Sequence, residues 1–370
     1  MKNHAAIRVG IVLLMANLCQ AGSQSRSAQV DALFPPSSPG PGAVVAVVDH
    51  GRVVLEKAYG LANVGAKLPL TVHSVFDLAS VSKQFTAMGI MILAQEGRLN
   101  LNDSICKFFP EFSPFGCAIT LRHLLNHTSG LPDYEHLFRA SGLVATNYPR
   151  AAKEARDTYE PTSRDALRLM ARQGKLRFKP GDKWEYSDSG YVVLAQVIEK
   201  VSGESYGRFL AENIFRPAGM TETVVYDETR PEIARRAVSY QPVKNEFKPI
   251  DYTPLNLIYG DGNVNTTVGD MIKWDNALTG DKLVHRATLQ EAFTRGALNN
   301  GTKFDYGFGW ALRKRHNTET TEHNGSWVGF RSGIVRFSQR QLTIIILSNS
   351  AGFPMGEMEK KIEAIYWDEP

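Results

Sequence analysis

The sequence predicts an α+β protein of two lobes, in which an antiparallel sheet flanked by helices adjoins a mostly helical lobe. Valine-rich segments separated by turns lie near both ends of the chain and indicate β-hairpins. Between the two ends, apolar residues recur with helical periodicity in one segment after another. Because hairpins pair neighbouring strands antiparallel, they argue against a doubly wound parallel sheet.

The strands are predicted in two hairpins, the first at 43–49 and 53–59 around His50 and Gly51. The second is predicted at 330–337 and 342–348, and a terminal helix at 355–367 follows it. Residues 43–79 and 265–370 are therefore assigned to the sheet-containing lobe, and residues 80–264 to the mostly helical lobe.

The helices have apolar periodicity and mostly end at glycine or proline, as helix ends commonly do. They are predicted at 82–96, 120–126, 164–173, 190–201, 206–214, 268–278 and 285–294. The polar residues between 140 and 165 favour an irregular loop over the helical lobe.

The N-terminus has the pattern of an export signal. Lys2 and Arg8 precede a short apolar stretch at 9–19, and small and polar residues follow. Residues 1–21 are predicted to be a signal peptide, cleaved after Ala21 or near Ala28; an uncleaved anchor is the alternative. The apolar stretch is short for a bilayer span, so no membrane span is expected after signal removal. The protein is expected to be periplasmic or secreted, and the Pro/Gly-rich residues 22–42 to form a flexible lead-in.

Composition narrows the class of protein. The 370 residues are 43% hydrophobic and 22% charged, as in ordinary globular proteins. The net charge of +4 is spread along the chain without a basic stripe, which argues against a nucleic-acid partner. If Cys19 leaves with the signal, Cys106 and Cys117 remain, and in an oxidising compartment they predict a disulfide. Two unpaired thiols are the alternative.

The most informative motif is Ser80-Val81-Ser82-Lys83 at the start of a predicted helix. Residues i and i+3 share a helix face, so the Lys83 amine can reach the Ser80 hydroxyl, which needs such an activator to act as a nucleophile. Apolar segments on both sides indicate burial, which would lower the pKa of Lys83 and favour its use as a base. The alternative is a solvated helix start with Ser82 as the N-cap.

A second candidate group is Tyr186 and Asp188, which follow a Pro-Gly turn and precede a predicted helix. A phenol placed there can point into a cleft, and beside a lysine it can relay a proton. In the alternatives, Tyr186 is a half-buried tyrosine with a hydrogen-bonded hydroxyl, and Asp188 is the N-cap of the helix.

His323 to Ser326 precede the second hairpin. Gly325 permits close backbone approach, and amides near Ser326 can complete an oxyanion hole with the Ser80 amide. An ordinary glycine-containing turn is the alternative.

No metal ion or cofactor is predicted. His123 and His127 have a zinc-like i, i+4 spacing, but Leu124 stands where a glutamate is needed and no third ligand is evident. The sequence contains no G-x-S-x-G elbow, P-loop or G-x-G-x-x-G motif.

In their order along the chain, these motifs resemble the serine β-lactamase and penicillin-binding-protein superfamily, in its class C β-lactamase-related branch of esterases and D-peptidases. The resemblance runs from about residue 40 to residue 367. The segments that carry it are 76–83 (FDLASVSK), 124–132 (LLNHTSGLP), 180–191 (PGDKWEYSDSGY), 259–264 (YGDGNV) and 323–325 (HNG).

The resemblance implies a cleft between an α/β lobe and a helical lobe. It implies Ser80 as the acylated nucleophile, Lys83 as its activator and Tyr186 as the proton shuttle to the leaving group. The Ser80 and Ser326 amides would form the oxyanion hole.

Two substrate-site residues depart from the family pattern. The family often has Asn where Asp188 stands, and a carboxylate cannot donate a hydrogen bond to a substrate carbonyl. Lys-Thr-Gly is usual where His323, Asn324 and Gly325 stand, and a mostly neutral histidine is poorly suited to a substrate carboxylate.

The sequence therefore predicts an exported serine hydrolase that acts on small esters, amides or D-amino-acid peptides. A true β-lactamase and a penicillin-binding sensor without turnover are the alternatives. The sequence leaves open the natural substrate, the oligomeric state, and whether Lys83 or Tyr186 takes the first proton.

Overall fold

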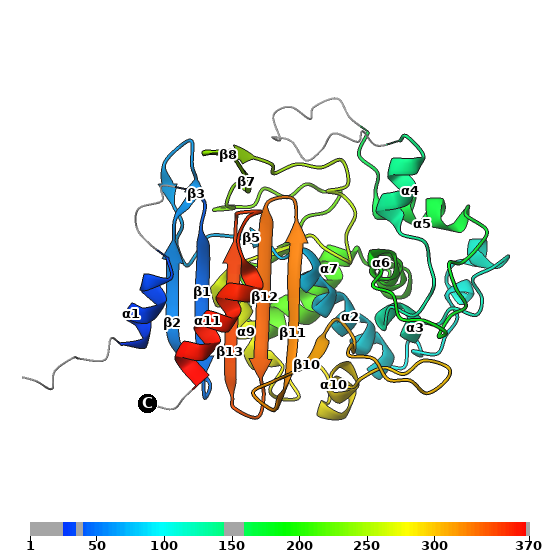
Figure 1. The fold of residues 1–370 in the computed structure, drawn as a ribbon. Coiled ribbons are helices and arrows are strands. Elements are labelled where there is room, and N and C mark those ends of the chain that lie inside the picture. The colour runs from blue at the N-terminus through cyan, green and yellow to red at the C-terminus, as the bar shows by residue number, and fades with distance from the viewer. Residues whose placement is uncertain (1–24, 35–39, 144–158, 368–370) are drawn as a thin grey trace, which may run out of the picture.

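A six-stranded antiparallel sheet stands beside a helical lobe in the computed structural model, which describes residues 25–34, 40–143 and 159–367 (Figure 1). The predicted signal peptide and much of the predicted 140–165 loop lie outside the described residues. The predicted α+β class is confirmed. In the order β10-β11-β12-β13-β1-β2, the strands span Ala311–Arg315, Thr318–Trp327, Phe330–Phe337, Leu342–Ser348, Ala43–Asp49 and Arg52–Tyr59.

Both predicted hairpins are confirmed, and the two chain ends meet in the middle of the sheet. β1 pairs with β2 on one side and with β13 on the other, with Val45 opposite Ile346. β12 pairs with β13 through Ile334 and Ile345. Strands β10 and β11 extend the sheet beyond the prediction. Their polar sequence, rich in Thr, Glu and Arg, conceals the strand pattern.

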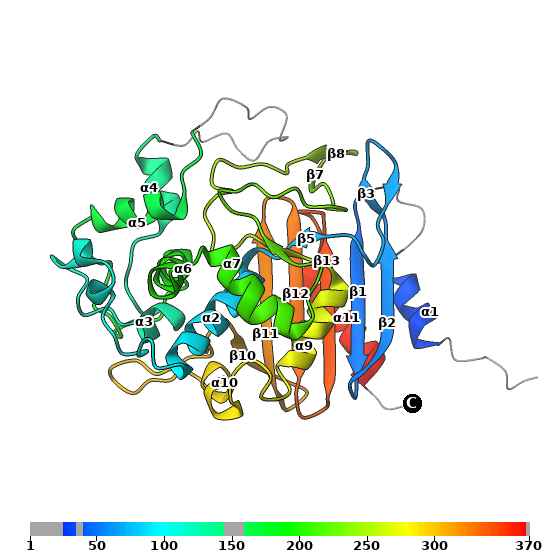
Figure 2. The same cartoon turned by 180° about the vertical axis from the view of Figure 1, so that it is seen from behind.

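The sheet is the middle layer of three, and its central strands β12, β13 and β1 are buried on both faces. Along β1, Val44 and Ala46 pack into the core shared with the helical lobe, whereas Val45 and Val47 pack under the terminal helix α11 (Met355–Trp367). This period of two is that of a strand. Figure 2 shows the opposite side, with α9 (Val268–Ala277) and α7 (Tyr206–Leu210) in front of the sheet.

The predicted flexible lead-in is wrong at α1, a helix at Arg26–Ala32. Val30 is fully buried in the α11-side core, and Asp31 accepts hydrogen bonds from Lys57 Nζ and Tyr59 Oη on β2. A seven-residue helix is too short for its apolar period to stand out beside a Pro/Gly-rich segment, so tertiary contacts decide its structure.

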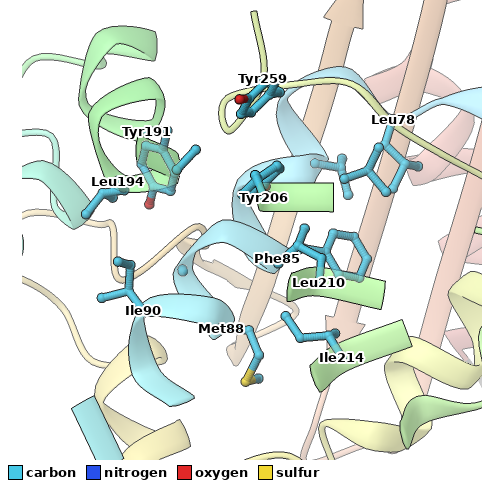
Figure 3. Close-up of a cluster of buried hydrophobic side chains, with 14 of the residues drawn as sticks. Leu78, Phe85, Met88, Ile90, Tyr191, Leu194, Tyr206, Leu210, Ile214 and Tyr259 are labelled. Carbon is cyan, nitrogen blue, oxygen red and sulfur yellow. The ribbon is translucent and has the colours of Figure 1, made fainter. Parts of the chain in front are cut away.

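The helical lobe packs around α2 (Lys83–Gln95), whose residues from Lys83 to Leu93 are all buried. Figure 3 shows Phe85 and Met88 of α2 beside Leu210 of α7 and Ile214 of the following π-helical turn η5 (Ala211–Phe215). Because α2 also contacts α6 (Asp188–Ser202), its N-terminal end is fixed between the helical lobe and the sheet.

The remaining elements are short. The helices are α3 (Leu121–Leu125), α4 (Tyr134–Ala140), α5 (Ser163–Ala171), α8 (Arg216–Ala218), α10 (Arg286–Ala292) and the 3₁₀ turns η1 (Ala79–Ser82), η2 (Ile105–Lys107) and η3 (Pro110–Phe112). The strands are β3 (Leu61–Asn63), β4 (Leu68–Pro69), β5 (Phe76–Asp77), β6 (Val224–Val225), β7 (Tyr240–Val243), β8 (Glu246–Pro249) and β9 (Val264–Thr266). The predicted helices all correspond to observed ones, with ends that differ by a few residues; α4 was not predicted.

Two further features bear on the sequence predictions. Cys106 and Cys117 are joined by a disulfide, with Cα atoms 5.2 Å apart. Within the described ranges, no helix has both the length and the apolar character needed to cross a bilayer.

Candidate active site

Ser80 lies in η1, the 3₁₀ turn that leads from β5 into α2. Asp77 Oδ1 accepts a hydrogen bond from the Ala79 amide at 2.7 Å, and Ala79 has a φ of +48°. The chain therefore turns sharply just before Ser80. Ser82 makes no side-chain cap; its hydroxyl accepts a hydrogen bond from the Val264 amide at 3.1 Å. Ser82 therefore occupies the N-cap position of α2, but its side chain does not cap a helix amide, and that part of the alternative is wrong.

The strand β11 packs directly against the Ser80 turn. A Cβ at Gly325 would lie 2.2 Å from Leu78 O, so only glycine permits this approach. Ser332 on β12 donates a hydrogen bond to the same carbonyl. His323 to Trp327 extend β11 beyond its pairing with β10, which places Ser326 beside Ser80 in the lining of one cavity. The alternative of an ordinary turn at His323–Ser326 is wrong.

Lys83 is fully buried one turn after Ser80, and its ammonium contacts three oxygen atoms. Lys83 Nζ lies 3.1 Å from Ser80 Oγ, 2.6 Å from Asp188 Oδ1 and 3.0 Å from the Asp261 carbonyl oxygen. Burial by itself lowers the pKa of Lys83, but the Asp188 carboxylate counteracts it and the pKa lies above its ordinary value. The prediction that burial tunes Lys83 toward a resting base is wrong, because the sequence did not reveal this ion pair.

Tyr186 lies against Lys83, whose Nζ is 4.9 Å from the phenol ring centroid. Burial raises the pKa of Tyr186, while the Lys83 charge and hydrogen bonds with Lys83 and Ser80 lower it; the net direction is upward. The resting side chain is therefore a neutral phenol in contact with both residues of the Ser-Lys pair.

His127 packs against the Tyr186 ring. Its buried ring lies 4.4 Å from the Tyr186 ring, between centroids, and its Nδ1 accepts a hydrogen bond from the Ser187 amide at 3.1 Å. His123 Nδ1 accepts from the Thr120 amide. Among the described residues, no group of three His, Cys, Asp or Glu side chains is placed to hold a metal ion.

Asp188 is the first residue of α6 and points toward Lys83. The helix cap is Ser187, whose hydroxyl accepts a hydrogen bond from the Gly190 amide at 3.3 Å. The alternative of Asp188 as the N-cap is therefore wrong, and its carboxylate is available to Lys83.

His323 is a buried, neutral histidine. Its Nδ1 lies 2.8 Å from the Asn324 carbonyl oxygen, which can only accept, so Nδ1 carries the proton. Its Nε2 then accepts from the Tyr306 hydroxyl at 3.0 Å. Burial first, and the Lys83 charge second, lower the pKa of His323 to about 4. The site therefore lacks the permanent cation that Lys-Thr-Gly provides.

Comparisons with known proteins identify the family of this chain. The Beta-lactamase family model matches residues 30–365. The chain belongs to the beta-lactamase family. This membership makes it a serine hydrolase, as the resemblance predicted.

Relatives within the beta-lactamase family include "Penicillin-binding protein 4*" of Bacillus subtilis, which is 37% identical over 321 residues covering 82% of this chain and 67% of the relative. A D-aminopeptidase of Gluconobacter oxydans is 27% identical, covering 88% of this chain and 60% of its own. The chain therefore spans only about three fifths of that curated relative. The octameric penicillin-binding protein homologue from Pyrococcus abyssi has a TM-score of 0.74 and 27% identity, covering 92% of this chain and 74% of its own.

Two cavities meet at the Ser80–Tyr186 contact. A small one of about 40 Å³ is lined by acidic residues and by both hydroxyl-bearing residues of the proposed oxyanion hole: Ser80, Ser326, Glu135, Asp188 and Asp261. A larger one of about 420 Å³ is lined by His323 and by four aromatic residues, Trp184, Tyr186, Phe304 and Tyr306. Three charged residues of both signs, Asp305, Arg313 and Glu322, also line it.

Several residues of these cavities were not predicted from the sequence. Asp261 contacts Lys83 through its backbone carbonyl, and no side-chain motif encodes that contact. Glu135 lies on the unpredicted helix α4, and Tyr306 reaches the site from a segment of turns and bends before β10. The tertiary fold brings each of these residues to the site, and no motif of fixed spacing marks them in the sequence.

Proposed function

We propose that this chain hydrolyses small amides, peptides and esters through an acyl-enzyme on Ser80. The observation that carries the proposal is the buried contact of 3.1 Å between Lys83 Nζ and Ser80 Oγ, with the Tyr186 phenol bonded to both. A serine hydroxyl becomes a nucleophile when a neighbouring group accepts its proton in the transition state. The turn at η1 presents that hydroxyl to a cavity large enough for a small reacting group.

The remaining roles follow from position. The Ser80 and Ser326 amides form the oxyanion hole, because both residues line the same cavity and β11 is held against η1 at Gly325. Tyr186 delivers a proton to the leaving group, since its phenol contacts Ser80 and lines the larger cavity in which that group would lie. A water molecule then attacks the acyl-enzyme and releases the acyl group from Ser80, with the proton transfers in the reverse order.

The two cavities favour particular substrates. Glu135, Asp188 and Asp261 make the small cavity acidic, which suits an acyl portion with a free amino group. The aromatic cavity suits an apolar leaving group, since Trp184 and Phe304 offer ring faces to it. The relationship to D-aminopeptidases supports the same class, an amino-acid amide or short peptide with a free amine.

Export to the periplasm or medium belongs to the proposal. The charged and apolar N-terminal sequence supports it, and so does the Cys106–Cys117 disulfide, because such bonds persist in oxidising compartments.

The central experiment compares the wild type with Ser80→Ala on the 4-nitroanilide of D-alanine and on a short-chain nitrophenyl ester. Both substrates should be cleaved by the wild type and, with Ser80→Ala, should fall to background while the melting temperature changes little. Cleavage that survives Ser80→Ala would exclude Ser80 as the nucleophile.

The β-lactamase alternative is tested in the same assay with a chromogenic cephalosporin. The neutral His323 offers no permanent charge to the carboxylate of that substrate, so turnover should be weak beside that of the anilide. Turnover of the cephalosporin above that of the anilide would favour a β-lactamase, and labelling by a fluorescent penicillin without release would favour a sensor.

A further inference from the structure

The Lys83 ammonium is enclosed by acceptors. Three oxygen atoms lie within 3.1 Å of its Nζ, at Ser80 Oγ, Asp188 Oδ1 and the Asp261 carbonyl, and the Tyr186 phenol is a further partner. The shortest contact, 2.6 Å, is to a carboxylate, and the lysine side chain has no exposed surface. A charged lysine here has no lone pair with which to take the Ser80 proton. Another group must therefore accept a proton when the serine attacks.

We propose that Asp188 is the proton acceptor for Ser80, and that Lys83 relays the proton between them. Lys83 passes one N–H proton to Asp188 Oδ1 along their hydrogen bond, and rotation about the Cε–Nζ bond then turns the lone pair of Nζ toward Ser80. Nζ takes the hydroxyl proton as Ser80 Oγ bonds to the substrate carbonyl carbon and the C=O electron pair moves to oxygen. The products of the step are an oxyanion, a Lys83 ammonium and a neutral Asp188 acid, so protons and charge balance. The inference rests on the proposed function.

The groups around Asp188 favour Asp188 as the charged carboxylate of the site. On α4, Asp133, Tyr134 and Glu135 face it, with Glu135 paired to Arg139 at 2.7 Å. Burial first, and then Asp188, raise the pKa of Glu135 to about 7 and that of Asp261 to about 8. These two acids therefore hold their protons to a higher pH than an ordinary carboxyl group, whereas Asp188 is the carboxylate that contacts the Lys83 ammonium, at 2.6 Å. The other titratable groups facing Asp188 are Lys83, Tyr186, Tyr306 and His323.

This role depends on the carboxylate at position 188. Proteins that it resembles often have Asn at this position, and an amide cannot accept a proton at neutral pH. In such a protein the base must be the lysine or the tyrosine itself. The exchange of Asn for Asp thus changes where the Ser80 proton goes, while the positions of Ser80 and Lys83 stay the same.

The test is the pH dependence of kcat/KM for the nitrophenyl ester, measured on the whole chain with the wild type and Asp188→Asn. In the wild type, activity should persist toward acid for as long as the Lys83–Asp188 ion pair holds, because the proton acceptor is a carboxylate. In Asp188→Asn the base must be the neutral Lys83 amine, which exists only at higher pH. The acid limb of the profile, where kcat/KM falls as the pH is lowered, should then move up by at least about one pH unit. The kcat/KM of Asp188→Asn should consequently be about tenfold or more lower at pH 6 than at pH 9.

Two other outcomes would overturn the proposal. If Lys83 is the base of the wild type, removing its carboxylate partner lowers the lysine pKa, and the acid limb moves down. If Asp188 only holds Lys83 in place, activity falls by the same factor at every pH.

Two further variants keep the test decisive. Asp188→Glu retains a carboxylate and should keep the acid limb near its wild-type position even where the rate drops; an upward shift here would count against the proposal. Glu212→Gln removes a carboxylate that lines neither cavity and pairs with Arg216 at the surface, and it should shift the limb by less than about half a unit. Activity that survives Ser80→Ala would instead overturn the proposed function and this step with it.

Discussion

The two cavities beside the Ser80–Tyr186 contact differ in size and in the residues that line them. The acidic cavity, about 40 Å³, is lined by η1, by the first residues of α4 and α6, and by the end of β11. Ser80 lies in η1, Lys83 at the start of α2 and Asp188 at the start of α6. The aromatic cavity, about 420 Å³, draws on residues near the sheet edge, including Phe304, Tyr306 and His323. The chemistry therefore lies in the helical part of the cleft, and the space for a substituent lies toward the sheet.

The difference indicates that the two ends of a substrate are recognised by different forces. In the acidic cavity, Asp188 is neutralised by Lys83, and the buried Glu135 and Asp261 gain by meeting a cation. In the aromatic cavity, His323 is neutral. An apolar leaving group that packs on the aromatic rings is stabilised there because apolar surface is removed from water. We therefore expect kcat/KM to depend more strongly on the charge of the acyl portion than on the size of the leaving group.

The largest expected effect comes from Glu135→Gln in the acidic cavity. The value of kcat/KM for the free-amine D-alanine anilide should fall about tenfold or more, because the variant lacks a carboxylate that would face the ammonium group of the substrate. The N-acetylated anilide, which has no ammonium, should be cleaved as before. Steady-state kinetics on the two substrates measures the ratio.

A matched control for this variant is Glu212→Gln. Glu212 forms the same i, i+4 hydrogen-bonded pair with Arg216 on the surface that Glu135 forms with Arg139. It lines neither cavity and should leave both substrates unaffected. If Glu135→Gln lowers kcat/KM equally for the free and the acetylated anilide, the acidic cavity does not recognise the charge of the substrate.

A smaller effect is expected from Phe304→Ala in the aromatic cavity. Aromatic leaving groups should lose about three- to tenfold in kcat/KM, because one ring face is removed. A methylamide leaving group, which does not reach the ring, should lose less. Competition between an anilide and a methylamide in one reaction reports the change.

Phe247→Ala is the control for that variant. Phe247 is a half-buried phenylalanine on β8 and lines neither cavity. If Phe304→Ala and Phe247→Ala change the anilide preference equally, the aromatic cavity does not hold the leaving group.

The sequence predicted the helices and the chemistry-bearing motifs better than the electrostatics of the site. The periodicity around Phe85 placed α2, and the S-x-x-K spacing placed Lys83 beside Ser80, because both are local properties of a helix. The charge state of Lys83 was beyond the sequence, since it depends on Asp188, which lies 105 residues away along the chain. Burial was expected to lower the lysine pKa, and a distant carboxylate reversed the direction.

The smallest expected effect is thermodynamic and separates the two cavities without any substrate. Asp261 is buried, and its Oδ1 has no hydrogen-bond partner, whereas Oδ2 accepts from Tyr134. Burial raises its pKa from 3.8 to about 8, and Asp188 adds to the shift. A pKa raised in the folded state means that this group's contribution to stability is fully present below about pH 4 and is lost as the pH rises through about 8.

Asp261→Asn removes the titration and keeps an acceptor for Tyr134. The melting temperature of the variant minus that of the wild type should therefore increase between pH 4 and pH 9, by a few degrees for a chain of this size. Asp305→Asn in the aromatic cavity is the control, because its side chain is 56% exposed and pairs with Arg295 at the surface. The melting temperature of Asp305→Asn minus that of the wild type should change much less between pH 4 and pH 9. A pH-independent difference for Asp261→Asn would mean that its carboxylate is solvated when ionised, and the acidic cavity would then be as open to water as the aromatic one.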